Sequence, residues 1–462
     1  MPESWATLGI DLHLEPTGPG LRRGLTDALR DAVRTARLAP GTRLPSSRAL
    51  AADLGIARNT VAEAYADLVA EGWLTARQGS GTHVADRAVA TPAAKAARPR
   101  IPARPAYDLR PGSPDLAAFP RAEWLRATRR ALAAAPHDAL GYGDPRGRPE
   151  LRAALAGYLS RARGVHADPE RVLVCAGFAH ALGLLARVLR ARGVQTVAVE
   201  SYGLAQHREL LTTAGLRTVP LPFDDRGTDP RTPPEDAGAV LLTPAHQFPM
   251  GMALRPDRRA AVVDWARRTG AVVLEDDYDG EFRYDRQPVG ALQGLDPGRT
   301  VYLGTASKSL APGLRLAWAV LPPGLAEEAA EAKGGTDTCG APEQLTLAEF
   351  LTSGAHDRHV RAARLRYRRR RDALVAALAA RAPEVRATGI AAGLHAVLRL
   401  PPGTEPEVLR AAAWQRLALF GLAGFRHPQA VTDPVDAVVV GYGTPPDHAW
   451  TGALDALCRV LP

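Results

Sequence analysis

Residues 304–315 read GTASKSLAPGLR and place Lys308 among small, hydroxyl-bearing neighbours. The sequence contains only two other lysines, Lys95 and Lys333, so lysine is not used here as a general solubilising residue. A lysine amine can lose its proton and form a Schiff base with an aldehyde, which arginine does not readily do. Because Arg315 follows seven residues later, the stretch fits an aldehyde cofactor that also carries a phosphate. Taken alone, it fits a surface lysine on a loop equally well.

Length and composition limit the class of protein. At 462 residues and 46% hydrophobic content, the chain is long enough for two or three domains with large cores. It has no apolar run long enough to span a bilayer and no basic-then-apolar signal pattern at its start. Its cysteines, Cys175, Cys339 and Cys458, are few and scattered, which favours a reducing compartment. We therefore expect a cytoplasmic protein.

Positive charge is unevenly distributed along the chain. The net charge is +9, which allows a polyanionic partner. Residues 1–86 have a net charge of −1, residues 87–106 have +5, and the remainder has +5. A nucleic-acid-binding function must therefore depend on where individual arginines lie, and not on a basic surface overall.

The hydrophobic pattern divides the chain into three zones. Residues 1–86 are predicted to form three short helices and a strand–turn–strand hairpin, because apolar residues recur at helical spacing between glycine stops. Residues 87–106 are rich in alanine, proline and arginine without an apolar period, which predicts a semi-stiff tether. Residues 107–462 alternate helical patterns with short apolar strands, which predicts an α/β domain built on a mostly parallel sheet.

The third zone has six predicted strands before its pattern changes. They are Val172–Cys175, Val197–Val199, Val240–Thr243, Val272–Glu275, Val301–Gly304 and Leu316–Val320. From about Gly324 the pattern becomes helical and then mixed, so we expect a smaller C-terminal lobe.

The N-terminal zone has the organisation of a DNA-reading unit. A helix, a four-residue link at 54–57, a second helix and a β-wing form a compact way to place a helix in the major groove. The exposed start of that helix carries Arg58, Asn59 and Thr60. Arginine can fork onto guanine, asparagine onto adenine, and threonine can reach a phosphate or a thymine methyl. The alternative is a solvated helical domain with a few surface arginines.

Three stretches of this zone resemble the winged helix-turn-helix of the GntR family in one register. Residues 38–48, 54–61 and 68–74 read LAPGTRLPSSR, LGIARNTV and LVAEGWL. One departure is Ala57, which stands where the family often has a serine or threonine. The resemblance implies that the DNA contacts are Arg48, Arg58, Asn59, Thr60, Gln78, Gly79 and Ser80.

The third zone offers the groups that pyridoxal phosphate (PLP) requires: a lysine, an acid near the pyridine nitrogen, a partner for the phenolic oxygen and a phosphate cup. Open α/β sheets bind ligands at the carboxyl ends of their strands. Asp276 follows an apolar strand, and Tyr278 faces the same side if the strand continues. Gly177 opens a helix, where free N–H groups suit a phosphate, and Thr305 and Arg315 add a hydroxyl and a charge. Each residue alone has a simpler interpretation, as a solvated strand end or a turn.

This zone resembles the fold-type I aminotransferase family over most of its length. The resemblance implies that Lys308 is the Schiff-base lysine, that Asp276 pairs with the pyridine nitrogen and that Tyr278 meets the phenolic oxygen. It implies no metal. The other implied cofactor contacts are Gly177, Phe178, Ala179, Thr305, Ser307, Arg315, Tyr142, Tyr202 and His246.

Some of these assignments depart from the family pattern. Phe248 takes the place of the usual asparagine, and His246 or Gln247 is the candidate substitute. Tyr202, the candidate ring that stacks on the cofactor, is shifted by two positions. Tyr142 is expected to reach the phosphate in the partner subunit's site.

Head, tether and body together resemble the MocR/GabR family of transcriptional regulators. The resemblance implies a homodimer that binds a double-stranded DNA operator. It also implies a small-molecule effector, either PLP itself or an amine or amino-acid-like compound, which acts by shifting the population of two states.

Val439 departs from the family in a way that bears on catalysis. It stands where aminotransferases have an arginine that binds the substrate carboxylate, and an aliphatic side chain cannot do so. We therefore predict little or no transaminase turnover, although Arg426 offers a shifted carboxylate partner. Two alternatives are a working aminotransferase with an appended DNA-binding head and a DNA-binding protein whose body is only a dimerisation scaffold.

The segment Arg358–Asp372 contains eight arginines. We favour a solvated helix face, whose arginine stems cover the body, over an auxiliary DNA-facing patch.

Overall fold

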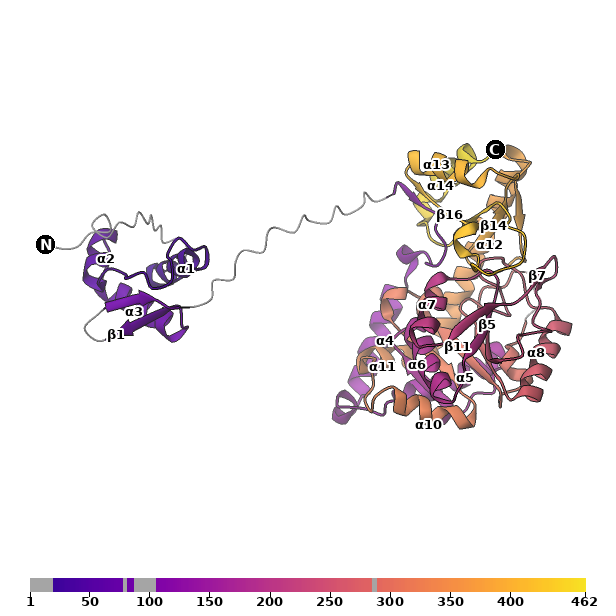
Figure 1. The fold of residues 1–462 in the computed structure, drawn as a ribbon, viewed down its shortest axis with the longest axis horizontal. Coiled ribbons are helices and arrows are strands. Elements are labelled where there is room, and N and C mark those ends of the chain that lie inside the picture. The colour runs from indigo at the N-terminus through magenta and orange to yellow at the C-terminus, as the bar shows by residue number, and fades with distance from the viewer. Residues whose placement is uncertain (1–19, 78–80, 87–104, 285–288) are drawn as a thin grey trace. The chain divides into compact units, whose positions relative to one another are not determined.

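The structure is a computed structural model that describes residues 20–77, 81–86, 105–284 and 289–462. The chain divides into two compact units, a head (Met1–Ala103) and a body (Arg104–Pro462), both visible in Figure 1. Two predictions lie outside the described residues. They are the wing-tip contacts Gln78, Gly79 and Ser80, and residues 87–104 of the tether.

The described part of the head contains three helices and a hairpin around one core. Ser46 caps α2 because its hydroxyl accepts a hydrogen bond from the N–H of Ala49 at 3.1 Å, and Gly55 ends α2 in the left-handed conformation. Leu29, Leu50 and Leu68 are fully buried, one from each helix, in this core. The elements are α1 (Leu21–Arg34), α2 (Ser47–Leu54), α3 (Arg58–Ala70), β1 (Leu74–Arg77) and β2 (Gly81–Val84).

A seven-stranded sheet forms the centre of the body, in the order β4-β12-β11-β10-β9-β5-β6. Neighbouring strands are parallel except that β12 is antiparallel to both β11 and β4. All six predicted strands lie in this sheet. The sequence did not indicate β6, which has a charged residue and a proline at its ends. The strands are β4 (Val172–Cys175), β5 (Thr196–Val199), β6 (Arg217–Pro220), β9 (Ala237–Leu242), β10 (Val272–Asp276), β11 (Thr300–Thr305) and β12 (Ala317–Val320).

Helices cover both faces of this sheet, and alternate strand residues enter different cores. On β4, Leu173 and Cys175 pack with α6 and α10, whereas Val172 and Val174 pack with α5 and α11. The body is therefore a layered α/β fold, as predicted. Its helices are α4 (Arg121–Ala134), α5 (Pro149–Arg163), α6 (Phe178–Ala191), α7 (Ala205–Thr213), α8 (Pro256–Thr269), α9 (Ala306–Ser309), α10 (Pro323–Ala332), α11 (Ala341–Thr352) and α12 (Ala355–Arg381).

The C-terminal part forms a smaller lobe with its own core, as expected, at one end of the body (yellow in Figure 1). A four-stranded antiparallel sheet, β13-β14-β17-β16, is covered by α12, α13 and α14. The first strand of the body, β3, pairs with β15 in this lobe. The elements are β3 (Tyr107–Asp108), β13 (Arg386–Thr388), β14 (Ala396–Arg399), α13 (Glu405–Trp414), β15 (Leu417–Ala418), β16 (Phe420–Gly421), β17 (Ala437–Val440) and α14 (Asp447–Val460), and a short hairpin elsewhere in the body is formed by β7 (Phe223–Asp224) and β8 (Gly227–Thr228).

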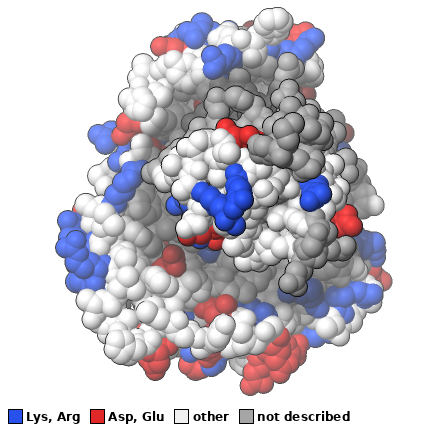
Figure 2. All heavy atoms as spheres, turned by 90° about the vertical axis from the view of Figure 1, so that its left-hand side faces the viewer, with Lys and Arg blue, Asp and Glu red and all other residues white. Residues whose placement is uncertain are grey.

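Figure 2 shows Lys and Arg side chains as well as Asp and Glu side chains at the surface of the described residues. Within the arginine-rich segment of α12, Arg370 is buried and binds Asp115 at 3.0 Å and the carbonyl of Pro445 at 2.6 Å. This arginine therefore ties the start of the body to the C-terminal lobe. None of the helices that the structure describes is long and apolar enough to cross a membrane.

Candidate functional site

The predicted DNA-reading residues of the head lie at its surface. Arg58 begins α3, and Arg58 and Asn59 are exposed while Thr60 is partly exposed. Arg48 is exposed on α2. The residue before α3, Ala57, makes no side-chain cap, so the first N–H groups of this helix have no side-chain partner from that position. The start of α3 thus presents free donors and an arginine at one place.

Acidic residues further along α3 form ion pairs with arginines of α1. Arg22 binds Asp67 at 2.7 Å and Glu63 at 3.2 Å, and Arg30 binds Glu71 at 2.8 Å. By contrast, Arg58 has no ion pair among the described residues. This pairing explains how a head with a net charge of −1 can still present an unneutralised basic end at its surface.

The body contains a cavity of about 490 Å³ at the carboxyl edge of its sheet. Parallel strands end at the same edge, so residues distant in sequence meet there. The wall from the sheet includes Glu200 after β5, Thr243 after β9, Asp276 at the end of β10 and Thr305 at the end of β11. The opposite wall comes from the start of the body and the C-terminal lobe, and includes Gly112, Leu394, His395, Phe420 and Thr444.

Lys308 projects into this cavity from the short helix α9. Its Nζ donates to the carbonyl of Gly112 at 2.5 Å. Burial lowers the pKa of Lys308, while Asp276 and Asp279 act in the opposite direction. Thr305 caps α9 by accepting from the N–H of Ser307 at 3.1 Å. The amine is therefore held by one carbonyl and lies in a setting that eases loss of its proton.

Asp276 is the buried acid beside that amine. It is 6% exposed, it lines the cavity, and its Oδ1 has no hydrogen-bond partner among the described residues. Burial raises the pKa of Asp276 well above its usual range, and Lys308 opposes this. A buried carboxylate oxygen without a donor fits a ligand that brings one, such as a protonated pyridine nitrogen.

The start of α6 forms a close approach between backbone and guanidinium. Gly177 has φ 90°, and a Cβ at this position would lie 2.5 Å from Nη2 of Arg315. Arg315 also donates to the carbonyl of Ala176 at 2.8 Å. Free N–H groups at a helix start together with an arginine fit a phosphate. Phe178, the first residue of α6, lines the cavity and packs on His207 with ring centroids 4.6 Å apart.

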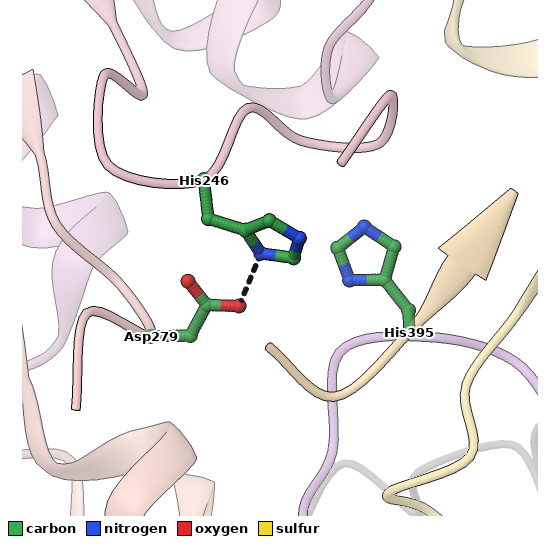
Figure 3. Close-up of side chains that lie close together, drawn as sticks. All are labelled: His246, Asp279 and His395. Carbon is green, nitrogen blue, oxygen red and sulfur yellow. Dashed lines mark hydrogen bonds and ion pairs between the residues drawn. The ribbon is translucent and has the colours of Figure 1, made fainter. Parts of the chain in front are cut away.

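Tyr278 lies beside a histidine–aspartate pair (Figure 3 shows His246, Asp279 and His395). The Tyr278 hydroxyl lies 3.1 Å from Nδ1 of His246, and the same nitrogen lies 2.8 Å from Oδ2 of Asp279. Tyr278 lines the cavity, but His246 is 2% exposed and is not part of its wall. His246 therefore contacts Tyr278 without lining the cavity itself, and its direct contact with the cofactor stays a prediction.

Known protein families match both the head and the body of the chain. Residues 21–84 match the bacterial regulatory proteins of the gntR family, and residues 109–444 match aminotransferase class I and II. The HTH-type pyridoxine biosynthesis transcriptional regulator PdxR of Corynebacterium glutamicum is 35% identical over 440 residues, 94% of this chain and 95% of that protein. The probable rhizopine catabolism regulatory protein MocR of Rhizobium meliloti is 35% identical over 450 residues, 91% and 90% of the two chains. The chain belongs to the MocR-type transcriptional regulators.

The body of this MocR-type regulator has the fold of PLP-dependent aminotransferases. A solved kynurenine aminotransferase of Pyrococcus horikoshii is similar with a TM-score of 0.68 and 26% identity, covering 77% of this chain and 90% of that one. The fold class predicted from the sequence is thus confirmed.

Of the other residues predicted to contact the cofactor, some line the cavity and others do not. Ser307 and Tyr202 line the cavity, but Tyr202 is 1% exposed and packs with Val439 in the interior of the C-terminal lobe. Tyr142 is 98% exposed and is not part of this cavity, and Ala179 follows Phe178 on α6 without lining it. The roles of these residues stay predictions.

Val439 stands where the sequence resemblance predicts a carboxylate-binding arginine, and Arg426 is the predicted shifted substitute. Val439 is fully buried, and Arg426 donates to the carbonyls of Ala430 and Thr432. Neither lines the cavity.

Sequence reasoning missed two cavity residues on α7. Arg208 lines the cavity, donates to the carbonyls of Gly203 and Phe425, and has no ion pair among the described residues. Burial lowers the pKa of His207 to about 4, so its ring is neutral at pH 7. A usable signal was present, because both residues lie in the helix that follows β5, whose carboxyl end faces the ligand-binding edge.

Proposed function

We propose that this regulator binds operator DNA through the start of α3 and binds PLP through Lys308, so that the state of the body controls DNA binding. PLP would supply an aldehyde for the lysine and a conjugated ring whose absorbance reports the linkage. Lys308 would hold the aldehyde carbon, Asp276 the pyridine nitrogen, and Arg315 with the start of α6 the phosphate. Tyr278 would face the phenolic oxygen.

The single observation that carries this proposal is the meeting of Lys308 with the unpartnered Oδ1 of Asp276 in one cavity. A buried carboxylate is costly without a donor or a cation. The carbonyl partner of Lys308 does not compensate it. A ligand that carries both an aldehyde and a protonated ring nitrogen satisfies the two groups together.

The test is to add PLP to the cofactor-free full-length protein and to follow its visible absorbance. Borohydride reduction followed by peptide mass spectrometry should then place the reduced adduct on Lys308. A spectrum without a new band, or an adduct only on Lys95 or Lys333, would contradict the proposal.

The walls of the cavity bear on the choice between the two candidate effectors. Arg208 is the partly buried cation that could take an effector carboxylate or phosphate, because the site of Val439 offers none. The name of the PdxR relative refers to pyridoxine biosynthesis, which favours PLP itself. Titrating PLP and, separately, simple amino acids into the protein on its operator distinguishes the two. If amino acids alone changed DNA affinity, PLP would be a cofactor and not the effector.

The head can be tested independently of the body. Arg58→Ala should weaken operator binding by about 10-fold to 100-fold, since a good arginine–base contact contributes about 1–3 kcal/mol. Arg34→Ala is the matched control, because Arg34 is exposed at the end of α1 and already paired with Asp31 at 2.7 Å. Equal losses in both variants would point to general electrostatics and not to a base contact.

We also propose a cytoplasmic homodimer in which Tyr142 reaches the partner subunit's cavity. Its 98% exposure supports this, because the whole side chain is free to contact a second copy of the chain. Light scattering of the full chain tests the dimer.

The alternative, a working aminotransferase with a DNA-binding head, is favoured by the meeting of Lys308, Asp276 and Tyr278 in one cavity and by the likeness to kynurenine aminotransferase. Steady turnover of an amino donor with an oxo acid would support it.

A further inference from the structure

A buried Asp–His pair stands behind the tyrosine of the cavity. Asp279 and His246 are each 2% exposed, and Nδ1 of His246 lies 2.8 Å from Oδ2 of Asp279. The same Nδ1 lies 3.1 Å from the hydroxyl of Tyr278, which lines the cavity. The two segments involved, the loop after β9 and the loop after β10, are thus joined at one nitrogen atom.

Three potential metal ligands meet here, but the geometry is that of hydrogen bonds. The ligand atoms of His246, Asp279 and His395 lie within 4.8 Å of one another (Figure 3). The 2.8 Å separation is a normal charge-assisted hydrogen bond and is short for two ligands of one ion. A Cβ on Gly393 would lie 2.5 Å from both Oδ2 of Asp279 and Nδ1 of His246, so the backbone packs closely against the pair.

The pair determines where the hydrogens lie. An ionised carboxylate only accepts hydrogen bonds, so its contact with His246 requires the hydrogen on Nδ1. A protonated Nδ1 has no lone pair and cannot accept the hydrogen of Tyr278. It can share its own N–H with the tyrosine oxygen, and an oxygen that accepts a hydrogen bond is a better donor. Asp279 is also a hydrogen-bond partner that raises the pKa of the Tyr278 hydroxyl, so the hydrogen of this hydroxyl points either to Asp279 or to an acceptor in the cavity.

We propose that Asp279 and His246 are positioning residues that keep the Tyr278 hydroxyl as a hydrogen-bond donor directed into the cavity, toward the phenolic oxygen of bound PLP. The inference rests on the proposed PLP binding at Lys308. It assigns a role to His246 that differs from direct contact with the cofactor. Phe248, which takes the place of the family's asparagine, cannot donate a hydrogen bond, so this donor depends on Tyr278.

Other charged or titratable groups surround Tyr278 and must be held constant in a test. Asp276, Glu200 and Asp279 all act on its hydroxyl, and Lys308 and His395 line the same cavity. Burial lowers the pKa of His395 to about 3, and its Nε2 donates to the carbonyl of Pro249 at 3.0 Å, so this ring stays neutral.

The consequence is a shift in the protonation of the Lys308 linkage. A hydrogen bond donated to the phenolic oxygen stabilises its negative charge and competes with the linkage proton for that oxygen. The linkage therefore loses its proton at lower pH when the donor is in place. Loss of the donor should raise the midpoint of the absorbance change by about one pH unit.

The experiment is a pH titration of the visible absorbance of the PLP-loaded full-length protein. Asp279→Asn keeps the size of the side chain but lets its amide donate to Nδ1, and His246→Asn removes the ring. Both variants and Tyr278→Phe should shift the midpoint upward. His427→Gln is the matched control, because His427 is a buried histidine outside this cluster and should leave the midpoint unchanged.

A double variant tests whether Asp279 acts through the Tyr278 hydroxyl or directly through its own charge. In the Tyr278→Phe background, Asp279→Asn should cause no further shift if the carboxylate acts through the tyrosine. A shift of Asp279→Asn that persists in this background would overturn the inference. If His246→Asn does not fold, Asp279→Asn and Tyr278→Phe, singly and combined, still test the inference.

Two other results would overturn it as well. One metal ion per chain that is lost in Asp279→Asn would show that the three side chains are ligands. An absorbance band with equal midpoints in all variants would contradict this inference alone, whereas absence of any band in the unmodified protein would contradict the proposed PLP binding too.

Discussion

Lys308 and Lys333 both belong to the body, but their surroundings differ. The amine of Lys333 donates to the carbonyls of Pro145 and Val174 at 2.5 and 2.7 Å and to Asp337 at 2.8 Å. Among the described residues, the amine of Lys308 has one hydrogen-bond acceptor, the carbonyl of Gly112, and no carboxylate at ion-pair distance. The ammonium of Lys333 has three hydrogen-bond acceptors, whereas that of Lys308 has one.

The difference separates a structural lysine from a reactive one. Three acceptors occupy the N–H groups of Lys333, so its amine is fixed in place by hydrogen bonds. Burial lowers the pKa of Lys308, and its nearby acids act at longer range. A lysine that forms a Schiff base must lose its proton, and only the second environment allows this.

The largest expected effect is loss of the chromophore in Lys308→Ala. The variant should show no borohydride-stable PLP adduct at the cavity, while its free energy of unfolding without PLP should change by about 1 kcal/mol or less, because one hydrogen bond is removed. Lys308→Arg is the matched control, since it keeps a charge but cannot form the linkage. Visible absorbance and urea unfolding measure the two effects. An adduct that survives in Lys308→Ala would show that Lys308 is not the reactive lysine.

Lys333→Met should have the opposite pattern. It leaves Asp337 and two carbonyls without their cation, and breaking one side of a buried ion pair destabilises by about 3–5 kcal/mol. Urea unfolding should show this loss, while the folded fraction still forms the PLP chromophore. The double variant Lys333→Met/Asp337→Leu should recover part of the stability, because no unpaired charge remains. Unchanged stability in Lys333→Met would show that its three contacts contribute little.

The sequence predicted the cavity better than it predicted the groups behind it. Asp276 and Lys308 follow apolar strands, and parallel strands end at one edge, so their meeting follows from the pattern. The contact of His246 with Tyr278 and Asp279 depends on how two loops pack together, which no local period encodes. Tyr202 illustrates the same limit, because its packing on Val439 comes from the C-terminal lobe. Sequence patterns describe elements, whereas these contacts are set by tertiary structure.

Asp276→Asn should weaken PLP binding on the order of 10-fold to 100-fold, since a hydrogen bond to a charged group contributes about 1.5–3 kcal/mol. The amide cannot keep the ring nitrogen of PLP protonated, yet Lys308 remains able to react. Titration of cofactor-free protein with PLP, followed by absorbance, gives the affinity. Asp264→Asn is a suitable control because Asp264 is exposed on α8. Equal affinities of Asp276→Asn and the unmodified protein would remove Asp276 from the site.

Glu200 extends the comparison from amines to acids. It accepts from the hydroxyls of Thr228 and Thr243 and from the N–H of Thr243 at 3.2 Å, but within the part of the chain that the structure describes it has no cation partner such as Lys333 is for Asp337. Burial raises the pKa of Glu200 to about 7. The native state therefore holds this proton in a pH range where the unfolded state has released it.

Stability should consequently fall as pH rises toward 7, because a raised native pKa contributes stability below the unfolded pKa and loses it as pH passes through the native value. Glu200→Gln stays neutral at every pH, so it should gain about 2 kcal/mol relative to the unmodified protein between pH 5 and pH 7. Urea unfolding at several pH values measures the difference, and Glu209→Gln, exposed on α7, is the control. If the stability of Glu200→Gln and of the unmodified protein varied with pH in the same way, Glu200 would be ionised in the native state over this pH range. The contrast with Asp337 would then disappear.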